Sequence, residues 1–362
     1  MTTPLVSVLI PSYNHSSYIR ETIESICNQS YSSIELIVID DGSKDETVKL
    51  INSIQIYIKD NTFNFIFKHR ENRGICKTLN EAISLSSGDF ISIIASDDIM
   101  LPDTITTYVQ SMIYSNEYMV SHGDAYIVNS QHVINLSELG DKTSRLCKYE
   151  KKTSGYVFEE AIRNPLHTPF LAFYRREVFQ TIGLYDESLQ FEDVDMYIRL
   201  SSSFKLLYID RPVGVHRIHN SNTSHKKHII EGGIRSLIKK YSDFDLNCSE
   251  DQKLTLISSL KRGDFDYNKW KDLIRSKRKV VGWGTGASYS LFKTKYDIKL
   301  DYLIDSDTEK SGLEIDGMII TNPDKLLSEN RDEILVLILS SYFGEISTWL
   351  DNNNFEHMNS YL

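Results

Sequence analysis

The sequence FISIIASDD, residues 90–98, is an apolar run that ends in two adjacent carboxylates, Asp97 and Asp98. A second run, IELIVIDDGS at residues 34–43, ends in the same way with Asp40 and Asp41. Apolar runs of this length, bounded by Gly and Asp, are typical of buried strands. Ligands of open α/β sheets bind beyond the carboxyl ends of the strands, so the two pairs predict one acidic pocket there.

An acidic pocket repels an anionic ligand unless a cation lies between them. Mg²⁺ in proteins typically takes one or two carboxylates together with the phosphates of a substrate. The paired carboxylates therefore indicate a metal-dependent site for a nucleotide diphosphate compound. The pairs alone leave an alternative open, in which these side chains only cap backbone N–H groups in two turns.

Strand-like and helix-like segments alternate around these two runs. The expected strands cover residues 5–10, 34–39, 63–68 and 90–95, and the expected helices cover residues 17–29, 45–54 and 74–85. Strands separated by such helices indicate βαβ units and a mainly parallel sheet. A second α/β pattern begins at Lys279, after a charged helical stretch. We therefore expect an α/β domain over residues 1–225, a helical connector over 226–278 and a small α/β unit over 279–362.

The composition excludes some classes of protein. The chain has 362 residues, of which 41% are hydrophobic and 25% are charged, and its formal net charge is −10. A nonspecific nucleic-acid binder carries a basic footprint, so no nucleic-acid partner is expected. The four cysteines show no C-x-x-C spacing, which indicates neither a zinc site nor a disulfide framework and suits a reducing compartment.

The sequence predicts a cytoplasmic protein. The N-terminus leads directly into a strand without a signal peptide, and no apolar stretch approaches the roughly 20 residues that cross a bilayer. Basic residues between positions 226 and 277 predict a solvated helical face, and peripheral contact with an anionic membrane surface is the alternative.

Short motifs follow one another in a fixed order along the first part of the chain. They are VSVLIPSYN (6–14), QSY (29–31), ELIVIDDGSKD (35–45), NRG (72–74), Asn80, SGDFI (87–91), SDD (96–98), YDE (185–187), ED (192–193) and RIHNSNTS (217–224). As an ordered set they resemble the family 2 glycosyltransferases, which have the GT-A fold, over residues 5–225. The resemblance implies a mixed, mainly parallel sheet with flanking helices, a nucleotide-sugar donor and a divalent metal ion, Mn²⁺ or Mg²⁺.

The resemblance assigns donor contacts to several residues. Pro11 and Tyr13 match positions beside the nucleotide base, on which a tyrosine ring can stack. Asp41 matches a carboxylate that accepts a hydrogen bond from uracil N3–H, whereas Asp40 is assigned to the turn itself. Lys77, on the helix after Gly74, is expected to approach the diphosphate.

The resemblance also assigns the metal site. Asp98 matches the residue that binds the metal directly, and Asp97 the residue that contacts the sugar or ribose. His219 matches a histidine near the metal or diphosphate, whereas His216 replaces a frequent tyrosine and is expected to be structural. A metal there would offset the charge of the diphosphate and stabilise it as the leaving group.

Asp193 matches the catalytic base of the family, which removes the proton of the acceptor hydroxyl. Its neighbours Glu192 and Asp195 are expected to raise its pKa by like-charge repulsion. The alternative role is that of a helix N-cap. A single base with in-line displacement implies inversion at the anomeric carbon.

The C-terminal unit carries a separate motif. Gly282-Trp283-Gly284-Thr285-Gly286-Ala287 fits G-x-G-x-x-G/A, and Asp305 ends the next expected strand, as in dinucleotide-binding domains. Gly282, Gly284 and Asp305 are thus candidates for a nucleotide site in a Rossmann-like unit. Three alternatives remain: a structural or dimerisation module, which would make a homo-oligomer; a regulatory nucleotide or sugar-nucleotide site; and an NAD site.

Taken together, these patterns predict an enzyme that transfers a hexosyl or N-acetylhexosaminyl group from a UDP-linked donor. The expected acceptor is a hydroxyl of a glycan or of a lipid-linked saccharide in bacterial surface polysaccharide synthesis, by analogy of fold alone. The alternatives are a non-catalytic scaffold that binds nucleotide sugars and an NAD-dependent sugar-modifying enzyme centred on the C-terminal unit.

Overall fold

The computed structural model describes residues 3–129, 133–140, 143–146, 153–219, 222, 227–243, 248–262, 273–296, 298–340, 343–355 and 361. The chain divides into two compact units, Met1–Ile257 and Ser258–Leu362, and each is described by itself. Within the first unit lie both carboxylate pairs and the expected base.

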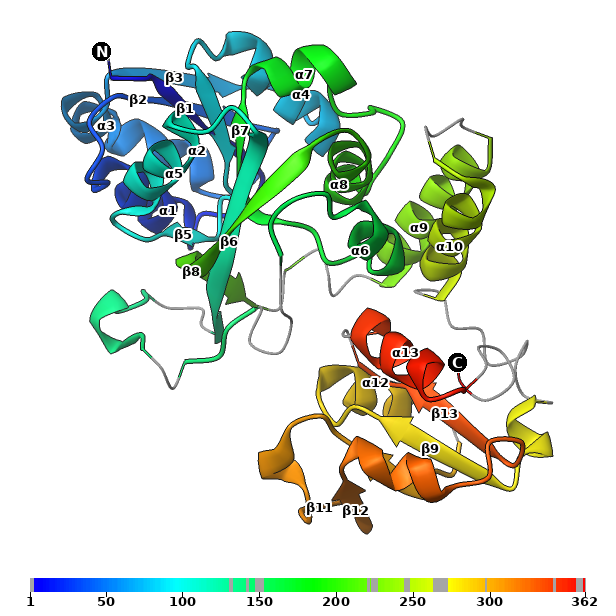
Figure 1. The fold of residues 1–362 in the computed structure, drawn as a ribbon. Coiled ribbons are helices and arrows are strands. Elements are labelled where there is room, and N and C mark those ends of the chain that lie inside the picture. The colour runs from blue at the N-terminus through cyan, green and yellow to red at the C-terminus, as the bar shows by residue number, and fades with distance from the viewer. Residues whose placement is uncertain are drawn as a thin grey trace. The chain divides into compact units, whose positions relative to one another are not determined.

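The first unit is built on an eight-stranded sheet in the order β3-β2-β1-β4-β7-β6-β8-β5 (Figure 1). Its strands are β1 (Val6–Ser12), β2 (Ile34–Asp40), β3 (Asn64–His69), β4 (Phe90–Ile93), β5 (Ile99–Met100), β6 (Tyr118–Asn129), β7 (Phe170–Arg175) and β8 (Lys205–Ile218). Strands β3, β2, β1 and β4 pair in parallel, as do β6 and β8, whereas β7 pairs antiparallel with β4 and β6 and β5 antiparallel with β8. The predicted mixed, mainly parallel sheet is confirmed.

Helices cover both faces of this sheet. One face packs against α1 (Ile19–Cys27), α2 (Thr47–Ser53), α3 (Gln55–Asn61) and α5 (Thr104–Ile113), and the other against α4 (Ile75–Leu85), α6 (Phe158–Arg163), α7 (Glu177–Ile182) and α8 (Glu192–Ser203). Along β2, Leu36 and Val38 face the first set and Ile37 and Ile39 the second. Burial on both faces explains why this strand reads as an unbroken apolar run.

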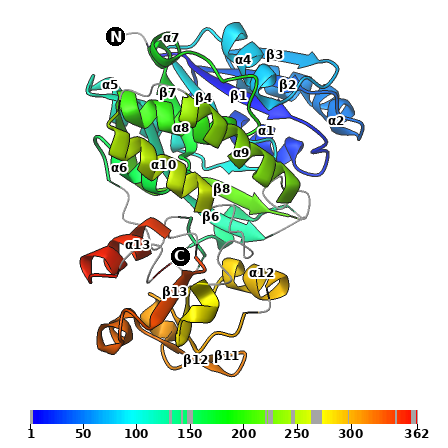
Figure 2. The same cartoon turned by 90° about the vertical axis from the view of Figure 1, so that its right-hand side faces the viewer.

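Two further helices follow, α9 (Lys227–Asp243) and α10 (Glu250–Arg262), and the first unit includes α9 and the part of α10 up to Ile257. Figure 2 shows them beside α8 and α6. The Tyr241 hydroxyl of α9 donates a 2.7 Å hydrogen bond to Asp195 of α8, and Gln252 of α10 donates to Glu159 of α6. The first part of the expected connector therefore packs on the first unit; residues 263–272 of that connector lie outside the described residues.

The second unit has a five-stranded sheet in the order β11-β12-β10-β9-β13. Its strands are β9 (Lys279–Trp283), β10 (Tyr302–Ile304), β11 (Glu314–Ile315), β12 (Met318–Thr321) and β13 (Ile334–Ile338), and its helices include α12 (Ala287–Lys295) and α13 (Phe343–Asn352). All pairs are parallel except β11 with β12. Across the described parts of both units, no helix is long and apolar enough to cross a bilayer.

Candidate active site

The Asp97-Asp98 turn joins β4 to β5 and is fixed from two sides. Thr22 of α1 donates its hydroxyl to the carbonyls of Ser96 at 3.0 Å and Asp98 at 2.8 Å. The buried Arg217 of β8 donates from Nε to the carbonyl of Asp97 at 2.9 Å. The turn is therefore a rigid platform for its two carboxylates.

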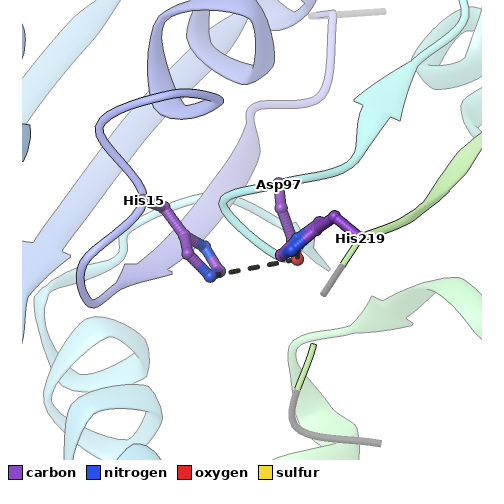
Figure 3. A group of neighbouring side chains, drawn as sticks. All are labelled: His15, Asp97 and His219. Atoms are coloured by element: carbon purple, nitrogen blue, oxygen red, sulfur yellow. Dashed lines mark hydrogen bonds and ion pairs between the residues drawn. The ribbon is translucent and has the colours of Figure 1, made fainter. Parts of the chain in front are cut away.

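Two histidines converge on one of these carboxylates (Figure 3). His219, just after β8, has Nε2 2.9 Å from Oδ2 of Asp97, and His15, in the turn after β1, has Nε2 4.0 Å from the same oxygen. One ligand atom from each of the three residues lies within 4.8 Å of the others, which makes them a candidate metal site. Asp97 and His219 are buried, and His15 is partly exposed.

The two imidazole rings are held in place by their neighbours. Nδ1 of His15 lies 2.7 Å from the hydroxyl of Ser96. Tyr18 stacks on His219 with ring centroids 4.4 Å apart, and the Arg217 guanidinium lies 5.1 Å from the Tyr18 ring centroid. Burial lowers the pKa of His15 and favours its neutral form, which is the form that binds metals.

Asp98 lies in different surroundings from Asp97. Its carboxylate accepts a 2.9 Å hydrogen bond from the backbone N–H of Arg217 and lies 3.4 Å from Nδ1 of His216. Burial raises the pKa of Asp98. The structure thus groups Asp97 with His219 and Asp98 with His216, and the direct metal contact that the resemblance assigns to Asp98 stays a prediction.

The earlier pair, Asp40 and Asp41, makes separate contacts, since β1 lies between β2 and β4. Asp40 accepts from the backbone N–H of Ser43 at 2.9 Å and lies 2.8 Å from Nδ1 of His69, so it holds the turn. Asp41 accepts from the N–H groups of Arg73 at 2.8 Å and Gly74 at 2.9 Å. Asp40 and Asp41 thus accept from backbone N–H groups, as the turn-capping alternative expects, and the four carboxylates do not share one set of contacts. The contact of Asp41 with a uracil base stays a prediction.

The other expected donor residues lie at the same carboxyl edge of the sheet. Tyr13 follows β1 and is 46% exposed, so its ring is open to a stacking partner. Pro11 is the penultimate residue of β1. Lys77 lies in the first turn of α4, directly after the loop that Asp41 holds through Gly74. A donor role for these residues stays a prediction.

Asp193 is the second residue of α8 and remains open to solvent. Thr168 donates its hydroxyl to Oδ2 of Asp193 at 2.9 Å, and both residues line a cavity of about 110 Å³ whose wall includes Tyr174 and Tyr185. The dense protein around the carboxyl group raises the pKa of Asp193, and burial raises the pKa of Glu192 to about 8.

The pKa of Asp193 is raised, as expected, but the repulsion expected from Glu192 and Asp195 is not the cause. Asp195 is fully buried and accepts from Arg199 at 2.9 Å and from Tyr241 at 2.7 Å, and the ammonium group of Lys240 lies 2.6 Å away. Its charge is therefore neutralised locally. The pKa of Asp193 is raised instead by the protein packed around its carboxyl group, and the hydrogen bond from Thr168 opposes that shift.

The topology places this carboxylate and the metal candidates at one edge of the sheet. β7 runs antiparallel to β4, with Ser92 opposite Phe173, so the start of β7 lies at the carboxyl end of β4. Thr168 lies two residues before β7, and the Asp97-Asp98 turn follows β4.

The glycine-rich turn of the second unit needs a glycine at position 284 for its backbone conformation and packing. Gly284 has φ +115°, and a Cβ built there would lie 2.5 Å from the carbonyl oxygen of Leu339. Gly282, in β9, faces leucine side chains. The Asp305 carboxylate accepts from Lys310 at 2.8 Å and from the hydroxyl of Thr285. A nucleotide role for Gly282, Gly284 and Asp305 stays a prediction.

Several site residues were not assigned a role from the sequence. They are His15, Tyr18, Ser96, Thr168 and Arg217. His15 could have been recognised as a candidate ligand from the sequence. It lies in the polar turn at the carboxyl end of the first strand, where ligands of α/β sheets bind.

The three-layer α/β fold of the first unit is that of a GT-A domain, and it carries a histidine–carboxylate cluster and an accessible carboxylate at one edge of its sheet. Residues 7–183, which lie within the first unit, match the model of the glycosyl transferase family 2. Its likeness to the crystal structure of S. aureus TarS 1-349 in complex with UDP-GlcNAc shows the same fold, with a TM-score of 0.55 at 19% identity over 74% of this chain and 75% of that one.

Curated relatives agree with this assignment. An uncharacterised glycosyltransferase of Rickettsia prowazekii is 30% identical over 229 residues, which are 61% of this chain and 66% of the relative. The chondroitin synthase of Escherichia coli is 29% identical over 268 residues, which are 70% of this chain and 36% of that protein. The chain thus spans just under two thirds of the first relative and about a third of the second.

Proposed function

We propose that the protein transfers a sugar from a nucleotide-sugar donor, UDP-linked, to a hydroxyl of a glycan or lipid-linked saccharide. The proposal rests on one observation: a candidate metal site and a candidate catalytic base lie at the same edge of the sheet. A metal-competent cluster of His15, Asp97 and His219 lies at the carboxyl end of β4, and Asp193, an accessible carboxylate with a raised pKa, is held by Thr168 at the same end.

The base role of Asp193 rests on its accessibility and its pKa. A general base works best when its pKa approaches the working pH and the acceptor can reach it. The raised pKa of Asp193 meets the first condition and its solvent exposure meets the second. A single base that deprotonates the acceptor oxygen supports attack from the face opposite the diphosphate, and therefore inversion.

The donor is proposed to lie along the carboxyl ends of β1, β2 and β4. The exposed ring of Tyr13 suits a nucleobase, and the loop that Asp41 orders leads to Lys77 and a diphosphate. A divalent ion, Mn²⁺ or Mg²⁺, held at the Asp97-Asp98 turn would neutralise that diphosphate. Equal loss of UDP binding in Asp97→Asn and Asp98→Asn would assign both carboxylates to this role.

The wider setting is proposed from the relatives. One relative is named a chondroitin synthase, and a role in bacterial surface polysaccharide synthesis, at the cytoplasmic side of the membrane, is proposed for this chain. Peripheral membrane contact and self-association stay predictions.

The test is release of UDP from a panel of UDP-sugars, with GDP- and dTDP-sugars for comparison, in the presence of Mn²⁺ and again after EDTA treatment. Asp193→Asn is expected to bind UDP like the wild type and to lose about 10²–10⁴-fold in turnover. NMR of the product's anomeric proton reports inversion. Near-normal turnover by Asp193→Asn would show that the base is elsewhere, and fluorescence titration with NADH tests the oxidoreductase alternative.

A further inference from the structure

The candidate metal cluster contains more protein ligands than a donor-dependent ion needs. Its three side chains come from separate places in the chain: the turn after β1, the turn after β4 and the end of β8 (Figure 3). Mg²⁺ sites that rely on substrate typically use one or two carboxylates and complete their shell with phosphate oxygens. Three converging protein ligands indicate an ion that is held before the substrate arrives.

The distances in the cluster suit a shared ion. Two ligand atoms that each lie about 2.1 Å from one ion can be at most about 4.2 Å apart. His219 Nε2 and Asp97 Oδ2 are separated by 2.9 Å, and His15 Nε2 and Asp97 Oδ2 by 4.0 Å, so the two pairs that include Asp97 meet the condition. The ligand atoms of His15 and His219 lie within 4.8 Å of each other.

The surroundings of His15 orient it as a ligand. Its Nδ1 lies 2.7 Å from the Ser96 hydroxyl, and a proton donated there leaves the lone pair of Nε2 directed toward Asp97. Metal-binding histidines are commonly oriented by a hydrogen bond from the other ring nitrogen. The His15 and His219 rings stand nearly perpendicular, at 88°, with centroids 5.8 Å apart, so they approach the carboxylate from different sides.

We propose that His15 is a third protein ligand of the metal ion, together with Asp97 and His219, and that the chain binds this ion without nucleotide. Two imidazoles and one carboxylate favour transition metals such as Mn²⁺, Co²⁺ or Zn²⁺ over Mg²⁺, which prefers oxygen ligands. The metal ion is then bound to the protein before the donor arrives and does not enter together with the donor. This inference rests on the proposed function, because it concerns the ion of that same site.

The test measures binding of Mn²⁺ alone to the EDTA-treated full chain, by isothermal titration and by the EPR signal of free Mn²⁺. The wild type is expected to bind one Mn²⁺ per chain without nucleotide, and Mg²⁺ at equal concentration should not displace it. His15→Ala and His15→Gln are both expected to weaken this binding at least about tenfold. His69→Ala removes a histidine that contacts Asp40 outside the cluster and should change the affinity less than twofold.

A second arm repeats the titration with UDP present, and circular dichroism confirms that each variant is folded. Wild-type binding of Mn²⁺ only when UDP is present would overturn the inference and leave the proposed function standing, as would unchanged affinity in both His15 variants. Absence of Mn²⁺ binding in both arms would overturn the inference and the proposed metal dependence together.

Discussion

The hydroxyl of Thr168 donates a 2.9 Å hydrogen bond to Oδ2 of Asp193, the proposed base. This bond fixes the carboxylate and stabilises its ionised form, so it opposes the rise in pKa that the protein packed around the carboxyl group causes. Thr168 is therefore a positioning residue for Asp193.

Thr168→Val is expected to lower kcat about 10- to 100-fold, the equivalent of losing one hydrogen bond to a charged group, about 1.5–3 kcal/mol. The KM for the donor should change little. Because the lost bond favoured the charged base, the acid limb of the pH–kcat profile should move to higher pH. Thr168→Ser retains the hydroxyl and is the matched control. An unshifted acid limb in Thr168→Val would contradict the positioning role.

Glu192 makes stability depend on pH. Burial, followed by the charge of Asp193, raises its pKa from 4.5 to about 8. Between pH 4.5 and about 8 the folded protein keeps a proton on Glu192 that the unfolded chain has released. The stability that this proton gives is therefore complete below the pKa of the unfolded state and is lost as the pH rises through the pKa of the folded state. The wild-type Tm should therefore fall between about pH 5 and about pH 9.

Glu192→Gln removes this titration, and its Tm should fall less over the same interval. Differential scanning calorimetry across that pH range measures the effect, with Glu46→Gln on the exposed surface as the control. Parallel curves for the wild type and Glu192→Gln would show that Glu192 is already ionised in the folded protein at neutral pH.

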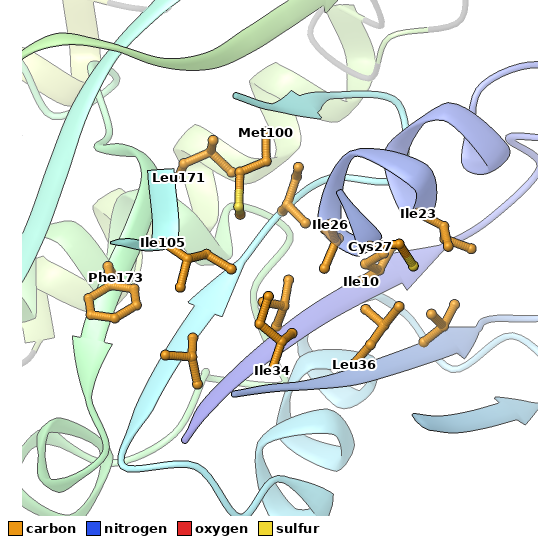
Figure 4. Close-up of a cluster of buried hydrophobic side chains, with 14 of the residues drawn as sticks. Ile10, Ile23, Ile26, Cys27, Ile34, Leu36, Met100, Ile105, Leu171 and Phe173 are labelled. Atoms are coloured by element: carbon orange, nitrogen blue, oxygen red, sulfur yellow. The ribbon is translucent and has the colours of Figure 1, made fainter. Parts of the chain in front are cut away.

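The strands of this fold could be predicted because they bury side chains on both faces. Figure 4 shows Ile10 and Leu36 of neighbouring strands packed with Ile23 and Ile26 of α1 in one cluster. Such continuous apolar runs, bounded by Gly and Asp, mark buried strands without any knowledge of their partners. The strand–helix alternation of the first 95 residues followed from these local patterns, except that they predicted one helix over 45–54 where the structure has α2 and α3.

The pairing of distant strands could not be predicted in the same way. β5 pairs with β8 through Ile99 opposite Val215, and this register places Asp98 beside His216 and Arg217. Periodicity reports which face of a strand is buried and says nothing about its neighbour in the sheet. The joining of His15 to Asp97 and His219 depends on that pairing, which is why the sequence indicated Asp97 and His219 separately and gave no role to His15.

Asp195 is expected to be essential for stability. It is fully buried among Arg199, Lys240 and Tyr241, and it joins α9 to α8. Asp195→Ala removes the buried counter-ion of Arg199 and one of the two carboxylates that pair with Lys240, which keeps Asp186 at 2.8 Å, and should lower the free energy of unfolding by about 3 kcal/mol. Urea unfolding followed by circular dichroism measures the loss.

Asp210→Ala is the control for Asp195→Ala, since the Asp210 side chain is 88% exposed and should change the free energy of unfolding by less than about 0.5 kcal/mol. A loss in Asp195→Ala no larger than in Asp210→Ala would show that α9 is held to α8 by other contacts.

Substitutions at two glycines of the C-terminal turn can distinguish a role in packing from a role in nucleotide binding. Gly284 has φ +115° and its Cβ would meet the Leu339 carbonyl, whereas a Cβ at Gly286 would meet nothing within 4 Å. Gly284→Ala is therefore expected to destabilise the second unit by about 1–3 kcal/mol, and Gly286→Ala to leave it stable. Hydrogen exchange of β9 and β13 amides measures both effects.

Gly286→Ala then tests whether a nucleotide binds where the turn has free space beside Gly286. A phosphate held at the start of α12 would approach the backbone at Gly286, so the added methyl group should weaken binding of UDP or NADH to the second unit. A structural module predicts instead that neither ligand changes the exchange of β9 amides in the wild type or in Gly286→Ala. Protection of those amides by NADH in the wild type, lost in Gly286→Ala, would overturn the structural alternative and assign a dinucleotide to the turn.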